Sequence, residues 1–211
     1  VRPDPARGNV NMLEASANEL RSTLKVGARK RFSIFNVSAN YQLQKVMADG
    51  PPNTPEMPTD SYNLLADWID SRPPAFPRHS LTTTLNAQLP LGVFVSGVMS
   101  TNNGGHYNIT TGRDDNRDGN VTDRPPGVPR NSGDRPHVLN FNFNISKALF
   151  FGAAAAPGTT RANLNVFANM TNAFNRLNPG PPSGVMTSPN FGRITSATNP
   201  REIEIGLRFQ F

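Results

Sequence analysis

The closing segment of the chain, residues 201–211, restricts the possible folds more than any other part of the sequence. Apolar side chains occupy every odd position from Ile203 to Phe211, whereas the even positions carry Glu, Gly, Arg and Gln. This repeat predicts a β-strand with one apolar and one polar face, because successive side chains of a strand point to opposite sides. The segment also has the length, about 9–11 residues, with which a strand crosses a lipid bilayer in a transmembrane β-barrel.

The same alternation recurs in six earlier segments, which are residues 20–29, 35–44, 81–89, 93–99, 139–146 and 162–169. It is less clean in 93–99, where Phe94 and Val98 lie on the otherwise polar side. The polar positions of these segments are mostly Asn, Gln, Thr and Ser, a composition that suits a hydrated lumen better than the Lys- and Glu-rich surface of a soluble sheet. All 20 prolines lie outside the seven segments, as expected because proline cannot donate a hydrogen bond to a sheet ladder. The sequence therefore predicts an all-β chain of seven antiparallel, up-and-down strands.

The composition excludes two other classes of protein. The chain has no cysteine, so neither a disulfide framework nor a cysteine-based metal site is available. No run of apolar residues approaches the ~20 that a transmembrane helix requires. A hydrophobic content of 36% is low for a helical membrane protein, but a barrel tolerates it because half of each strand and all of its loops are polar.

The connections between the seven segments alternate between short and long. The short ones are 30–34, 90–92 and 150–160, and the long ones are 48–78, 103–136 and 171–200. Outer-membrane barrels place short turns in the periplasm and long loops outside the cell. Seven strands fit poorly with a complete barrel, because bacterial barrels have an even strand number and open sheet edges are costly in lipid. We therefore expect residues 1–211 to be the C-terminal part of an outer-membrane β-barrel, and hence an incomplete barrel.

Several stretches carry a resemblance to a known family. The closing residues 204–211, with Gly206, Phe209 and the terminal Phe211, look like the signal read by the barrel assembly machinery. Residues 165–175, 191–194 and 107–114 are similar to segments of Oar-like proteins. On these motifs the chain resembles the C-terminal barrel segment of TonB-dependent outer-membrane receptors, and the resemblance covers most of its length.

The resemblance implies a location in the bacterial outer membrane and a function in energy-coupled import of a scarce nutrient or a large ligand. In this family an external ligand binds the outer loops and a plug domain, and the periplasmic TonB complex acts on the plug. The plug and the N-terminal strands of the barrel are absent from the 211 residues. The chain would then supply barrel wall and outer loops, in contact with outer-membrane lipid.

One loop carries a candidate metal site. Asp114, Asn116 and Asp118 alternate before Gly119, which fits the first half of a calcium-binding loop. Position twelve, where a bidentate Glu is expected, is Pro125, and Asp123 is the candidate substitute; the tentative ligand set is Asp114, Asn116, Asp118, Asn120 and Asp123. A structural Ca²⁺ would rigidify the loop. The alternative is a solvated turn, since Asp, Asn and Gly are ordinary turn residues.

No other cofactor and no catalytic motif is expected, so the chain is interpreted as a non-enzyme. The net charge is +6, but most arginines of the 103–136 loop are matched by aspartates, which argues against a nucleic-acid footprint. Two alternatives stay open. One is an outer-membrane barrel without a plug, with an adhesive or passive-pore function, and the other is a secreted, calcium-stabilised β-sandwich that binds a ligand.

Overall fold

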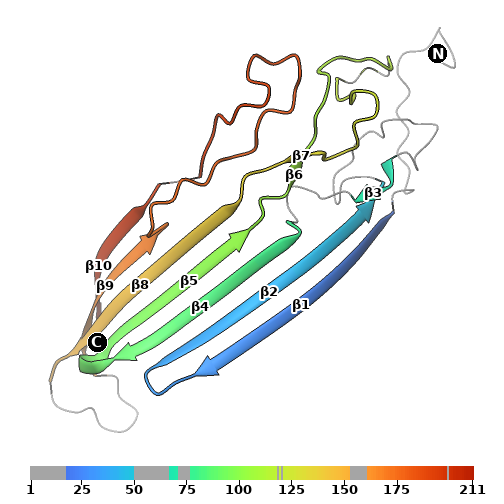
Figure 1. The fold of residues 1–211 in the computed structure, drawn as a ribbon. Helices are drawn as coiled ribbons and strands as arrows, with labels where there is room; N and C mark the ends of the chain where they lie inside the picture. The colour runs from blue at the N-terminus through green and yellow to red at the C-terminus, as the bar shows by residue number, and fades with distance from the viewer. Residues whose placement is uncertain are drawn as a thin grey trace.

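The computed structural model describes residues 18–49, 67–70, 77–117, 119, 121–152, 161–198 and 200–211. All seven predicted strands are confirmed (Figure 1). They are β1 (Glu19–Arg31), β2 (Phe35–Ala48), β4 (His79–Leu89), β5 (Val93–Asn102), β8 (Val138–Phe150), β9 (Asn163–Thr171) and β10 (Glu202–Gln210). The remaining elements are short, namely β3 (Ile69–Asp70), β6 (His106–Tyr107), β7 (Gly133–Asp134) and the 3-10 turn η2 (Pro90–Gly92).

Some strand ends differ from the sequence-based boundaries. Phe150, expected at the start of a turn, is the last residue of β8 and pairs with Asn163. Ala48, expected in a long loop, ends β2 and pairs with Glu19. In both cases the backbone ladder with the neighbouring strand continues past the point where the hydrophobic alternation stops, and hydropathy does not report that backbone pairing.

The long strands form one antiparallel up-and-down sheet in the order β1-β2-β4-β5-β8-β9-β10, with β3 added beside β2. Each long strand therefore pairs with the next one along the chain, and the short and long connections lie at opposite ends of the sheet (Figure 1). We call these the short-turn end and the long-loop end. The edge strands β1 and β10 do not pair with each other, so the sheet is not closed into a barrel.

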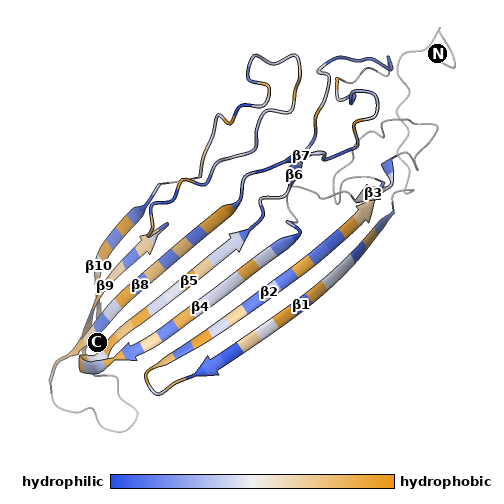
Figure 2. Cartoon of the chain, viewed as in Figure 1, coloured by the Kyte–Doolittle hydropathy of each residue, from blue (hydrophilic) through white to orange (hydrophobic). Residues whose placement is uncertain are grey.

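The register of the sheet places apolar residues beside apolar ones across its width. One row of paired residues is Phe35, Ala87, Val95, Ile145, Ala168 and Ile205. The adjacent row is Arg31, Asn36, Asn86, Ser96, Asn144, Asn169 and Glu204. Because neighbouring residues of a strand face opposite sides, the first row lies on one face, here called the apolar face, and the second on the other, the polar face. Figure 2 shows the resulting bands along the strands.

Side-chain hydrogen bonds between strands support the polar row. The Asn144 Nδ2 atom donates to Asn169 Oδ1 at 2.5 Å, and Asn169 Nδ2 donates to Glu204 Oε2 at 3.0 Å. One row away on the same face, the hydroxyls of Ser38 and Thr84 share a hydrogen bond of 2.5 Å. Polar side chains thus satisfy one another across strands, which stabilises the register.

The strands are also staggered along their axes. Phe35 is the first residue of β2, yet its row reaches Ile205 near the middle of β10. Successive short turns therefore lie progressively further along the strand direction. A displacement of this kind is the shear that a sheet requires in order to close with tilted strands.

The sheet is a single layer with very little core. Among the described residues, the buried hydrophobic side chains are Val46, Ala48 and Ala87. By contrast, Ile205, Leu207 and Phe211 on the apolar face are 76%, 69% and 93% exposed. The described part of the chain contains no helix of the length and hydrophobicity needed to traverse a membrane. The chain thus leaves one continuous apolar surface uncovered.

Candidate functional site

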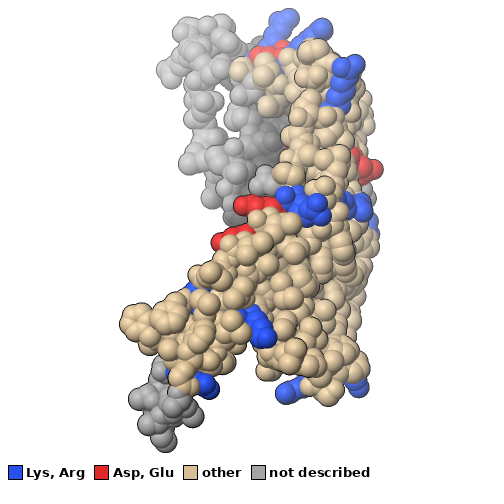
Figure 3. Space-filling view, turned by 90° about the vertical axis from the view of Figure 1, so that its left-hand side faces the viewer, with Lys and Arg blue, Asp and Glu red and all other residues tan. Residues whose placement is uncertain are grey.

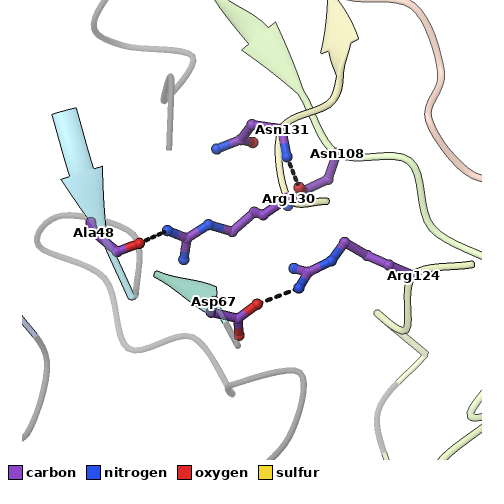
Figure 4. A network of polar contacts seen from close by, with 6 residues as sticks. All are labelled: Ala48, Asp67, Asn108, Arg124, Arg130 and Asn131. Carbon is purple, nitrogen blue, oxygen red and sulfur yellow. Dashed lines mark hydrogen bonds and ion pairs between the residues drawn. The ribbon is translucent and has the colours of Figure 1, made fainter. Parts of the chain in front are cut away.

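Polar contacts join two of the long connections at the long-loop end (Figure 4). The guanidinium of Arg124 donates to the carboxylate of Asp67, and both side chains are largely withdrawn from solvent. Arg130 Nη2 donates to the main-chain oxygen of Ala48, the last residue of β2, at 2.6 Å. Asn131 N donates to Asn108 Oδ1 at 2.7 Å. The described residues between 103 and 137 are therefore held against the end of β2 and the segment before β3.

The polar face is covered at the end that lies beside this network. Gln44, Val46 and Ala48 point to the polar face and are buried, whereas Asn36 and Asn40, on the same face nearer the short-turn end, are exposed. The buried Arg130 reaches this end of β2 directly. The polar face is thus open at the short-turn end and covered beside β2 at the long-loop end.

The third long connection is organised by asparagines. Asn178 is fully buried, accepts a hydrogen bond from Leu139 N at 2.9 Å and donates to Leu139 O at 2.9 Å. Its amide therefore pairs with the edge of β8 as a further strand residue would. Asn172 accepts from Arg176 N at 3.0 Å and donates to Arg176 O at 2.9 Å, which closes a tight turn after β9.

Main-chain pairing links this connection to residues 103–137. Thr110 N donates to Gly184 O at 2.9 Å, and Met186 N donates to Thr110 O at 2.9 Å. A Cβ atom on Gly184 would lie 1.9 Å from Asn108 O, so the close approach of the two backbones requires glycine at this position. The described parts of the three long connections therefore form one linked surface.

In the proposed calcium segment, aspartate side chains accept hydrogen bonds from the backbone of the same segment. Asp123 Oδ2 accepts from Asp115 N at 2.6 Å and from Asn116 N at 3.0 Å, and Asp114 Oδ2 accepts from Gly119 N at 3.0 Å. Asp118 and Asn120 lie outside the described residues. Within the described ranges, no three His, Asp or Glu side chains gather closely enough to hold a metal ion. The described contacts are those of an aspartate-stabilised turn, and calcium binding stays a prediction.

The three proposed assembly residues lie on two faces of the sheet, Gly206 on the polar face and Phe209 and Phe211 on the apolar face. Phe209 points to the apolar face and is exposed, and its ring centroid lies 5.9 Å from that of the exposed, terminal Phe211. Gly206 lies on the polar face opposite Phe167, whose ring covers it, and the Arg208 guanidinium lies 6.0 Å from the centre of the same ring. An aromatic ring over a strand glycine compensates for the missing side chain.

Substituting Gly206 tests this packing. A Cβ atom at position 206 would lie 2.3 Å from Phe167 Cζ, so Gly206→Ala must displace the ring, and we expect a loss of about 1–3 kcal/mol in the free energy of unfolding. Gly27→Ala in β1 is the matched control, because its Cβ would meet only Asn40 Oδ1, at 3.1 Å. Urea unfolding of the folded protein measures both, and the double variant Gly206→Ala/Phe167→Leu should recover most of the loss. Equal midpoints for the two single variants would contradict the proposed role of the ring.

The three histidines lie apart and have separate partners. Tyr41 Oη contacts His79 Nδ1 at 2.7 Å, Thr101 Oγ1 contacts His137 Nε2 at 2.8 Å, and His106 Nδ1 lies 2.8 Å from Asp134 Oδ1. Each therefore fixes a strand end or a short strand. On the side that Figure 3 presents, the Lys and Arg side chains form several small groups with uncharged surface between the groups.

Sequence reasoning missed the residues that link the loops. Asp67 and Arg124 are 57 positions apart, and nothing in their local sequence indicates that they meet. Asn178 carried a weak signal, because it precedes a proline and the Asn-Pro pair favours turns. Comparisons with protein-family models, with curated proteins and with solved structures found no match to this chain.

Proposed function

We propose that the chain forms part of the wall and the outer loops of a transmembrane β-barrel in the bacterial outer membrane, in a transporter of the TonB-dependent type. The observation that carries the proposal is the apolar face across seven paired strands, whose side chains are mostly half-buried on the central strands and exposed on β1 and β10. At about 25 cal/mol per Å² of apolar surface removed from water, a face of this width is too costly to leave in solvent. The hydrocarbon layer of a lipid bilayer is the environment that best matches this apolar face.

Strand length supports lipid as the cover. The seven long strands have 9 to 14 residues, and tilted strands of about 9–11 residues span the hydrocarbon core. The lysines on the apolar face are Lys30, Lys45 and Lys147, and each lies within three residues of the end of its strand. Long lysine side chains at such positions extend their amines to the membrane surface and leave their carbon stems in the apolar layer.

The two open edges support a larger barrel. β1 and β10 run in the same direction, because successive antiparallel pairings connect them through five intervening strands. Direct closure would therefore join two parallel strands in an otherwise antiparallel sheet. An odd number of further strands would restore antiparallel pairing throughout and give the even total of bacterial barrels. All residues of β1 are exposed, and an edge this long and open attracts pairing with another strand.

In this proposal the polar face lines the lumen and the linked long connections face the exterior. The ligand-facing surface is then the network around Arg130 and Thr110 rather than three independent loops. Energy coupling through TonB rests on the family resemblance of residues 204–211 and 165–175, with the plug supplied by the rest of the protein. A sandwich would need a second large sheet, and all the long strands of the described residues lie in one.

Removal of Phe211 tests the membrane assignment. In the protein as its gene encodes it, deletion of Phe211 is expected to lower the amount of barrel in the outer membrane severalfold, because the closing strand would lose its terminal apolar residue. Heat-modifiable migration on a gel, measured on the outer-membrane fraction, reports the folded barrel. Phe151→Ala is the control, since Phe151 is also an exposed aromatic residue at the short-turn end. Unchanged folded barrel after the deletion would argue against the proposal.

A further inference from the structure

Strand β1 carries a column of basic side chains on the polar face. Arg21, Lys25, Arg29 and Arg31 occupy alternating sites of the strand and therefore share this face. At the long-loop end, Arg21 is paired with Glu19 at 2.8 Å. Arg29 and Arg31, at the short-turn end, have no carboxylate within ion-pair distance among the residues that the structure describes. Figure 2 shows this end of β1 as strongly hydrophilic.

Two rows of the sheet bring neutral polar groups beside these arginines. Arg29 pairs with Ser38 and Ser38 with Thr84, while Arg31 pairs with Asn36 and Asn36 with Asn86. The six residues, together with Val37, line an open hollow of about 410 Å³. This volume falls in the range of about 300–1,000 Å³ that is usual for small-molecule sites. The hollow therefore offers to one occupant two cations, two amides and the one hydroxyl hydrogen that the Ser38–Thr84 hydrogen bond leaves over.

The chemistry of the lining selects the charge of that occupant. Arginine donates up to five N–H bonds from a planar group, which matches the oxygens of phosphate, sulfate and carboxylate. Hydroxyl and amide donors add further hydrogen bonds to the same oxygens. Among the residues that the structure describes, no acidic side chain lines the hollow, so a cationic ligand would meet unfavourable charge. The lining favours an oxyanion.

We propose that this hollow binds the oxyanion group of a small solute, with Arg29 and Arg31 as the charge-bearing contacts. The inference goes beyond the proposed transport function and depends on the polar face alone. It is independent of what covers the apolar face, and its failure can be distinguished from a failure of the membrane assignment.

Titration with inorganic phosphate tests the site. The folded full-length protein is titrated calorimetrically, with chloride used to hold the ionic strength constant. We expect saturable binding that weakens at least about tenfold in Arg29→Gln and in Arg31→Gln, because each removes a charge-assisted contact. Lys25→Gln is the matched control, since it removes the same charge from the same face of the same strand but does not line the hollow. Its affinity should stay within about twofold of the unsubstituted protein.

Two outcomes would overturn the proposal. Equal weakening in Lys25→Gln and in the arginine variants would mean that the general positive field of β1, not a site, attracts phosphate. Absence of saturable phosphate binding to the unsubstituted protein would overturn it as well. Loss of folded protein in the arginine variants, read from circular dichroism, would then assign the two arginines to carboxylates of another protein segment.

Discussion

Ile205→Lys is expected to remove most of the folded protein from the membrane. Ile205 lies near the middle of β10, on the apolar face, and is 76% exposed. A lysine facing lipid near the bilayer midplane costs about 2–4 kcal/mol. If the same face were in water, an exposed Ile→Lys change would alter the free energy of unfolding by no more than about 0.5 kcal/mol. The expected loss therefore depends on lipid contact.

A substitution in the adjacent row provides the control for Ile205→Lys. Ser96→Lys adds the same charge on the polar face, near the middle of β5, and is expected to assemble normally. Both variants are expressed in the full-length protein, and folded barrel is quantified in the outer-membrane fraction and after refolding into lipid vesicles. Equal yields of the two variants would indicate that lipid does not cover the apolar face.

The second large effect is expected from Arg124→Met at the long-loop end. The Asp67 carboxylate is buried, and removing its arginine partner is expected to cost about 3–5 kcal/mol. Because the lost contact joins residues 103–137 to the segment before β3, we expect local opening rather than global unfolding. Hydrogen exchange of amides such as Val128, which donates to Pro125 O at 3.0 Å, should accelerate about a hundredfold or more.

Two further variants define the origin of that effect. Arg113→Met removes an exposed arginine of the same connection and should leave exchange nearly unchanged, as expected for surface charges. The double variant Asp67→Leu/Arg124→Met removes both charges and should restore much of the protection, because no buried carboxylate remains without its arginine. If Arg113→Met accelerated exchange as strongly as Arg124→Met, the buried pair would not be the cause.

The strands of the sheet could be predicted from the sequence because the patterns that specify them are local. Alternation in segments such as 35–44 and 139–146 fixes which face each residue takes, and proline positions fix where strands cannot be. The errors at Ala48 and Phe150 arose where a strand continues through pairing alone. The alternation also excludes a register shifted by one residue, because that shift would place Phe35 opposite Asn86 and mix the faces.

The site was less accessible to sequence reasoning. Contacts such as Arg130 to Ala48 O join residues 82 positions apart. No local pattern in a single sequence indicates that two such distant residues meet. The aspartate-rich segment illustrates a different difficulty. Asp114 and Asp123 suit calcium ligands and turn formers equally well by composition, and in the structure both accept backbone hydrogen bonds.

The stagger of the strands determines how polar side chains would be arranged along a lumen bounded by this sheet. Residues that share one row, from Arg31 on β1 to Glu204 on β10, would lie at different depths along the axis of a tilted barrel. The row is then a helical track of four amides and one hydroxyl that begins at a cation and ends at a carboxylate, rather than a ring at one level. A molecule that exchanges hydrogen bonds along this track would rotate as it advances.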